Sequence, residues 1–175
     1  MTGGISNIRN VTGSQGNDLI VGDANSNVLK GGTGRNVIIG GTGPDTLDAS
    51  GASSDNILIG GTTDFDTNLA ALDAIFAEWT RTDLPPASSF DIRFSDLSSG
   101  KNQAHATPLN ILNGTPILLT PTTVHANSSS DTLSGSNQTD PTTGNRAHNW
   151  FFFDFDVDDV IVNFLASSDR KTKVQ

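Results

Sequence analysis

Residues 13–61 read GSQGNDLIV, GDANSNVLK, GGTGRNVII and GGTGPDTLD, then Ala49-Ser50, then GASSDNILI and Gly60-Gly61. Each nine-residue unit begins with glycine, carries Asp or Asn at its sixth position and carries Ile or Leu at its eighth position. The sixth-position residues are Asp18, Asn27, Asn36, Asp45 and Asn56, and the eighth-position residues are Ile20, Leu29, Ile38, Leu47 and Leu58. A fixed period of nine indicates that every unit adopts the same local structure.

Within each unit, the first six residues predict a turn and the last three predict a short strand. Glycine permits positive φ and the close approach of neighbouring backbone, and Asp or Asn tolerates left-handed conformations. The last three residues alternate about one inward aliphatic side chain, as in a strand. Because two units complete one coil, we predict a mainly β fold, a right-handed parallel β-roll over residues 13–61, with the eighth-position side chains inside.

This pattern resembles the G-G-x-G-x-D-x-U-x nonapeptide repeat of the hemolysin-type (RTX) calcium-binding proteins, over residues 5–61. The lead-in at residues 5–13 is similar to the segment that often precedes the first repeat in bacterial surface proteins of this kind. The resemblance implies Ca²⁺ ions between turns stacked one coil apart, held by backbone carbonyls and sixth-position carboxylates. It also implies a calcium-binding module of a secreted or cell-surface bacterial protein that folds when calcium binds.

Carried onto this chain, the resemblance implies metal ligands at positions one, three and six of the turns. They are Gly13, Gln15, Asp18, Asn27, Gly31, Thr33, Asn36, Gly40, Thr42, Asp45, Gly60 and Thr62, with Asp131 and Asp158 in later repeats. Stacked turns would pair Asp18 with Asn36 and Asn27 with Asp45, while the sixth turn has Phe65 at position six. Since most sites would hold one carboxylate, we expect weak affinities, on the order of 10⁻⁴ to 10⁻³ M. A ladder of Asx turns that needs no metal is the alternative for each site.

Composition narrows the possible partners. A net charge of -9 argues against binding to nucleic acid or to anionic membranes, and favours a cation as the binding partner. The absence of cysteine excludes disulfides and thiolate metal sites. The sequence contains no apolar run of 18 residues that would predict a membrane span. The first residues lack the features of an N-terminal secretion signal. The resemblance implies a secreted or cell-surface location, and the missing signal leads us to expect a type I-like route without a cleaved N-terminal signal.

The two predicted sheets differ at the residues that flank each inward side chain. Repeats one, three and five place only apolar residues there, namely Leu19, Val21, Val37, Ile39, Ile57 and Ile59. Repeats two and four place Val28, Lys30, Thr46 and Asp48 there. Soluble monomers rarely expose a large apolar face, so we expect the sheet of the odd repeats to be covered.

A candidate cover follows the repeats. Residues 68–81 read NLAALDAIFAEWTR, with apolar residues three or four apart and Pro85-Pro86 soon after. This spacing predicts an amphipathic helix that packs on the odd-repeat sheet, and a partner-binding helix is the alternative. Phe90, Phe94 and Leu97 predict a second short helix. Residues 109–125 favour short strands and turns.

The nine-residue phase returns in the last third of the chain. Positions six and eight are taken by Asp131 and Leu133, by Asn149 and Phe151, and by Asp158 and Val160. A loop is expected at 135–143. The return resembles the degenerate closing repeat of related surface proteins, with Trp150 to Phe153 as its aromatic strand. We therefore divide the chain into a nonapeptide-repeat roll at 1–66, a helical and irregular covering insertion at 67–125, and a closing repeat with a tail at 126–175.

Motifs of the common enzyme classes are missing from the sequence. His105, His125 and His148 lack the spacing of a zinc protease, and no serine lies in a G-x-S-x-G elbow. The Asp residues between 154 and 159 could offer paired carboxylates for glycoside hydrolysis, but a solvated or cation-binding strand edge is the simpler interpretation. We therefore expect no catalytic residues and no enzyme activity in this chain.

Two functional hypotheses remain. The first is a calcium-binding structural or adhesive module, with cell-surface or extracellular-matrix components as candidate partners. The second is a non-catalytic C-terminal accessory module of a secreted hydrolase or epimerase. A face for ice or adhesion built from Thr33, Thr42 and Thr62 is a minor third, because these threonines form no long rank.

Overall fold

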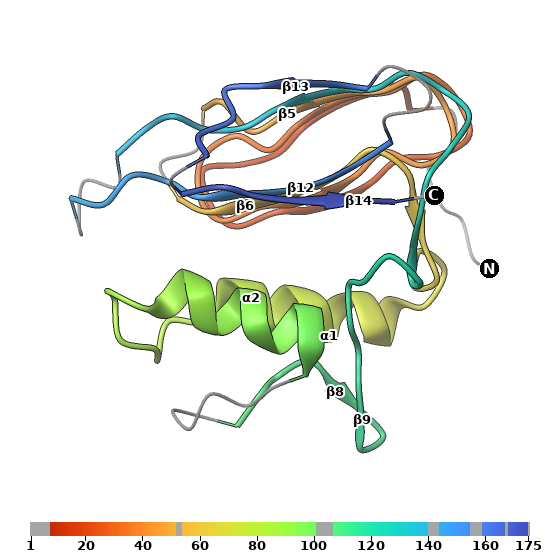
Figure 1. The fold of residues 1–175 in the computed structure, drawn as a ribbon. Helices are drawn as coiled ribbons and strands as arrows, with labels where there is room; N and C mark the ends of the chain where they lie inside the picture. The colour runs from red at the N-terminus through yellow and green to blue at the C-terminus, as the bar shows by residue number, and fades with distance from the viewer. Residues whose placement is uncertain are drawn as a thin grey trace.

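In the computed structural model, which describes residues 8–51, 54–100, 107–139, 144–154, 159–166 and 168–174, the chain forms a parallel β-roll with two helices on one side. The roll consists of two stacked sheets, and both helices lie beneath the sheet that contains β6, β12 and β14 (Figure 1). Neither helix is long and apolar enough to cross a membrane, within the residues described.

Each sheet has five parallel strands. The even-repeat sheet consists of β1 (Asn10–Thr12), β3 (Val28–Lys30), β5 (Thr46–Asp48), β11 (Thr132–Ser134) and β13 (Val160–Val162). The odd-repeat sheet consists of β2 (Leu19–Val21), β4 (Val37–Ile39), β6 (Asn56–Ile59), β12 (Asn149–Phe153) and β14 (Arg170–Lys173). The predicted parallel β-roll is thus confirmed, and the closing strands extend the same two sheets.

The interior of the roll is built from the eighth position of every repeat. All five eighth-position residues predicted to lie inside are buried, with exposed fractions of 0 to 7 %. In the even-repeat sheet Leu47 aligns with Leu133, and in the odd-repeat sheet Leu58 aligns with Phe151. The late frames of Leu133 and Phe151 are therefore confirmed, and the aromatic strand is core.

The last predicted frame is wrong by one residue. Leu133 aligns with Ile161 and not with Val160, so the inward residue of β13 is Ile161 and position six is Asp159. Asp158 itself lies outside the described residues. In the final strand Lys171 aligns with Phe151, and its Nζ lies 3.8 Å from the centroid of the Phe164 ring. A charged residue at the inward position ends the apolar column.

The two helices cover the odd-repeat sheet as predicted. The first helix, α1 (Leu69–Thr80), begins at Asn68, whose side chain accepts a hydrogen bond from the Ala71 N–H, and α2 (Ser89–Ser99) follows. One apolar cluster unites helix residues with the outer face of the sheet, and its buried members include Val37, Ile39, Ile57, Ile59, Leu72, Ile75, Trp79, Phe90, Leu97, Trp150 and Phe152. Among the residues that the structure describes, no helix covers the even-repeat sheet, and Lys30 and Thr46 are exposed.

Polar contacts fix the helices on the roll. The Trp79 indole N–H donates to the Asp55 carbonyl over 3.3 Å. The guanidinium of Arg93, a fully buried α2 residue, pairs with the Asp55 carboxylate and donates to the Trp79 carbonyl. A buried charge needs such a partner, so Arg93 and Asp55 set where α2 docks.

The insertion interrupts one turn of the roll. The chain leaves the stacked turns after Gly61 through β7 (Thr62–Thr63) and returns through β10 (Val124–His125), which pairs antiparallel with β7. A small hairpin of β8 (Ile111–Leu112) and β9 (Thr115–Pro116) lies between α2 and β10. The sixth turn therefore begins at Gly60 and is completed by residues 126–131.

We expect Trp79→Ala to destabilise the whole module by roughly 3 to 5 kcal/mol, because Trp79 is fully buried between α1 and the odd-repeat sheet. Urea unfolding followed by circular dichroism would measure this. Leu69→Ala on the same helix is the control, since Leu69 is 69 % exposed and its truncation should change the free energy of unfolding by less than about 0.5 kcal/mol. Equal effects of the two changes would contradict the role given to α1.

Candidate calcium-binding turns

A single hydrogen bond is repeated along both columns of turns. The side-chain oxygen of a position-six residue accepts a hydrogen bond from the backbone N–H of the position-six residue one coil earlier, in the turn that we call the turn below. The even column, which precedes the even-repeat strands, contains Asn27 N to Asp45 Oδ1 at 2.8 Å, Asp45 N to Asp131 Oδ1 at 2.7 Å and Asp131 N to Asp159 Oδ1 at 2.8 Å. The odd column contains Asp18 N to Asn36 Oδ1 at 3.0 Å and Asn36 N to Asn56 Oδ1 at 3.2 Å. The predicted pairs of turns are therefore neighbours.

Glycine at positions one and two allows the turns to stack this closely. A Cβ at Gly22 would collide with the Gly40 carbonyl oxygen of the turn above. Gly41 has a φ of +105° and faces the Asp23 carbonyl oxygen of the turn below, so a side chain there would be both strained and obstructed. The backbone carbonyls of neighbouring turns therefore face the next turn at short range.

In the odd column, stacked Asn side chains hydrogen-bond one another. Asn36 Nδ2 donates to the Gly34 carbonyl at 3.3 Å and to Asn56 Oδ1 at 3.2 Å. Asn56 Nδ2 donates in turn to the Ser54 carbonyl at 2.8 Å and to Asn149 Oδ1 at 3.3 Å. An amide carries both a donor and an acceptor, so stacked Asn side chains satisfy one another. Asn36, Asn56 and Asn149 therefore form a continuous chain of side-chain hydrogen bonds.

The other odd-column residues also bond among themselves. The Asp18 carboxylate accepts from the Ser14 N–H at 2.9 Å and from the Ser14 hydroxyl. The Gln15 carbonyl accepts from the Thr33 hydroxyl at 2.7 Å. Gly13 and Gly31 lie one above the other, since a Cβ at Gly13 would meet the Gly31 carbonyl oxygen. Asp18, Gln15 and Thr33 thus have hydrogen-bond partners within the protein.

The even column is richer in carboxylates, and one of them is incompletely satisfied. Asp45 is 3 % exposed, and its Oδ2 is buried without a hydrogen bond from any described residue. Burial, with a smaller contribution from the charge of Asp23, raises the pKa of Asp45 to about 6. Burial also raises the pKa of Asp131 to about 7, and that of Asp159. Buried carboxylates of this kind are stabilised by a cation.

The donors near Asp45 suit calcium, which prefers oxygen ligands. Asp45 Oδ2 lies beside Gly40, and the Gly40 carbonyl oxygen lies beside Gly22 together with Asn27 Oδ1. No three Asp, Glu or His side chains gather into a metal cluster within the described ranges. A calcium ion here would therefore depend on carbonyl oxygens and one carboxylate, which fits the weak affinity expected.

The structure places the remaining candidates as follows. Gly40, Thr42 and Gly60 lie in the even column next to Asp45 and Asp131. Thr62 lies in β7, where it pairs with His125 outside the stacked turns, because the insertion begins there. Phe65 packs against the apolar cluster of the helices.

Sequence reasoning missed two residues of the even column, Asn127 and Asp159. Asn127 is in the completed sixth turn and donates to three carbonyls, while Asp159 takes position six of the last even turn. A search for Asx residues in phase with Asp131 could have found Asn127 at position two of the frame that begins at Ala126.

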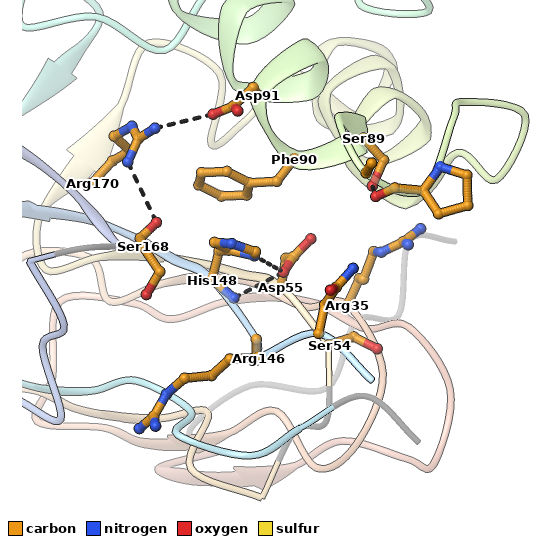
Figure 2. Close-up of a pocket in the computed structure, with 14 residues that line it drawn as sticks. Arg35, Ser54, Asp55, Ser89, Phe90, Asp91, Arg146, His148, Ser168 and Arg170 are labelled. Carbon is orange, nitrogen blue, oxygen red and sulfur yellow. Dashed lines mark hydrogen bonds and ion pairs between the residues drawn. The ribbon is translucent and has the colours of Figure 1, made fainter. Parts of the chain in front are cut away.

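A polar pocket of about 360 Å³ lies where the first turn of α2 meets the roll (Figure 2). His148 Nδ1 lies 3.0 Å from Asp55 Oδ1, and the Phe90 ring stacks on the imidazole with centroids 4.6 Å apart. Although burial opposes it, the hydrogen bond from His148 and the charge of Arg93 lower the pKa of Asp55. This cluster therefore links α2 to the segments that directly precede β6 and β12.

Fold and turns together define a class of protein, a parallel β-roll of nine-residue repeats that each consist of a turn and a short strand. Residues 12–47 match the family model of the RTX calcium-binding nonapeptide repeat, in four copies. Such repeats bind Ca²⁺, are typically structural and occur in secreted bacterial proteins. The resemblance and the cofactor inferred from the sequence are thus confirmed. No curated protein and no solved structure matches the chain.

Without calcium, the protein should lose stability as the pH rises. The folded pKa of Asp45, about 6, lies above the unfolded value of about 4, so its contribution is fully present below pH 4 and is lost as the pH passes 6. Asp45→Asn removes this contribution. Urea unfolding of the metal-free protein should therefore show that the free energy of unfolding falls more steeply between pH 4 and 7 for the wild type than for Asp45→Asn. Equal slopes for the two proteins would refute this.

Proposed function

We propose that this chain is a calcium-stabilised structural module of an exported bacterial protein, with Ca²⁺ bound in the even column between turns two and four. The observation that carries the proposal is Asp45, whose buried Oδ2 has no donor among the described residues. Of the position-six carboxylates at Asp18, Asp45, Asp131, Asp159 and Asp169, the other four each receive a second hydrogen bond from protein.

Asp45 would supply the carboxylate of the site. Asn27 would supply its side-chain oxygen, and the carbonyls of Asp23, Asn25 and Gly40 face the same layer. When bound, calcium would neutralise the buried charge and join two turns of the coil. These oxygens come from turns separated by a full coil, so the site exists only when the roll is formed.

Folding linked to calcium follows from this arrangement. A ligand that binds only the folded state stabilises it by mass action. The repeats contain many glycines, whose backbone loses much conformational freedom on folding. Calcium therefore offsets part of that cost in the first coils.

An extracellular setting suits the proposal. A site with one carboxylate binds calcium in the range of about 10⁻⁴ to 10⁻³ M, which is typical of extracellular modules. In this setting the module would help display or export the protein that carries it, and cell-surface or matrix components are the expected partners. The alternative, an accessory module of a secreted hydrolase or epimerase, has the same calcium chemistry and differs in the domains attached.

The proposal is tested by titrating the metal-free chain with CaCl₂ while following binding by calorimetry and structure by circular dichroism. We expect binding with a dissociation constant on the order of 10⁻⁴ to 10⁻³ M and a rise in melting temperature. Asp45→Asn should weaken this binding by at least about tenfold, because the remaining ligands are neutral. Its fold should persist, since Asn occupies the same position in the odd column.

Asp18→Asn is the matched control. Asp18 is also a position-six carboxylate, but its oxygens already accept from Ser14, so the change should leave calcium binding close to that of the wild type. A chain whose stability and spectrum are unchanged by millimolar calcium would overturn the proposal. Loss of binding in both variants would move the site away from Asp45.

A further inference from the structure

We propose that the side-chain amide of Asn127 takes the place of a calcium ion at the seam of the roll. The seam is the interrupted sixth turn, formed by Gly60 and Gly61 before the insertion and by residues 126–131 after it. This inference concerns the layer above the Asp45 site, and it rests on the proposed function only in treating calcium as the ion that such a layer would otherwise hold.

Four oxygens surround one nitrogen atom at the seam. Asn127 Nδ2 lies 3.0 Å from the Gly60 carbonyl, 3.1 Å from the Gly41 carbonyl, 3.4 Å from the Gly43 carbonyl and 3.1 Å from Asp131 Oδ2. Three backbone carbonyls and one carboxylate are the type of oxygen set that calcium binds. An amide nitrogen has only two hydrogens, so it shares them among more acceptors than it can fully satisfy.

The orientation of this amide is determined by its other end. Asn127 Oδ1 accepts from the Ser129 N–H at 2.7 Å, which requires an oxygen at that position and turns the nitrogen toward the four acceptors. The Ser129 hydroxyl donates to the neighbouring Thr42 carbonyl at 3.2 Å. The completed sixth turn therefore places side-chain donors at positions two and four, where turn four has Gly41 and Gly43.

The layer below shows the same arrangement without the amide. One coil earlier, the equivalents of Gly41, Gly43, Gly60 and Asp131 are Asp23, Asn25, Gly40 and Asp45. The residue at position two of the upper turn is then Gly41, which has no side chain, and no described residue donates to Asp45 Oδ2. The two layers thus differ in whether a side chain enters the space between the turns.

This substitution makes the seam independent of calcium. Asn127 binds Gly60 on the near side of the insertion and Gly41 in the turn below, so it joins segments that the insertion separates by more than sixty residues. An ion at the same place would hold these segments only while calcium was present. The coils that carry the helices can therefore remain joined when the first coils lose their calcium.

Asn127→Ser in the full chain tests this inference. In metal-free solution the variant should melt about 3 to 10 °C below the wild type, because four buried acceptors lose their donor. Millimolar CaCl₂ should restore most of the loss, and calorimetry should count one more bound calcium than in the wild type. Asn17→Ser is the control, since Asn17 is exposed in a turn of the odd column and only accepts from the Arg35 N–H.

Asn127→Asp is a second variant, which tests the inference if Asn127→Ser fails to fold. It keeps the size of the side chain but replaces the donor by an oxygen, so its melting temperature should respond more strongly to calcium than that of the wild type. The same gain of one ion should appear when Asn127→Ser is combined with Asp45→Asn, which separates the seam from the proposed calcium site. Unchanged metal-free melting of Asn127→Ser, or equal numbers of bound calcium in wild type and variant, would overturn the inference.

Discussion

The hydrogen bond from a backbone N–H to the position-six side chain one coil above is the interaction on which the rest of the roll depends. It sets the separation of the turns, and the parallel strands that follow each turn inherit their register from it. The same bond recurs beyond the regular repeats, where Asn149 N donates to Asp169 Oδ1 at 2.9 Å. This separation also explains the glycines at positions one and two, because a Cβ at Gly22 or Gly41, for example, would collide with a carbonyl oxygen of the neighbouring turn.

Both Asn and Asp accept this bond, but they differ in what their second side-chain atom requires. An amide brings its own donor, and the odd column uses it to link Asn36, Asn56 and Asn149 without charge. A carboxylate only accepts, so each Asp of the even column needs a further donor or a cation. The need for a further donor or a cation therefore differs from residue to residue within one fold.

The insertion covers the apolar face of the roll without interrupting the stacking of its coils. The odd-repeat sheet has an apolar outer face, and α1 and α2 cover it. Their docking is made specific by the buried pair of Arg93 and Asp55. Because the insertion enters and leaves through one turn, the coils on either side still stack in continuous sheets (Figure 1).

The sequence alone determined the parts of this protein that obey a period. The repeat of nine predicted the stacked strands, the inward Leu and Ile column, the pairing of Asp18 with Asn36 and of Asn27 with Asp45, and the apolar face that required a helix. These follow from spacing, because residues nine apart occupy equivalent places in successive half-coils. The late Asp158 frame failed because the period there is broken by a single residue, and one residue reverses which side chains face inward.

Only the tertiary structure decided how the broken turn is closed and which oxygens still lack a partner. Gly60 and Asn127 are more than sixty residues apart in sequence, and no local pattern places the Asn127 amide among carbonyls of another turn. Likewise Asp45 and Asp131 look alike in sequence as position-six aspartates, yet Asp131 Oδ2 accepts from Asn127 while Asp45 Oδ2 has no donor in the part of the chain that the structure describes. The difference arises from side chains that long-range packing brings into the space between turns, and that space does not exist until the coils are stacked.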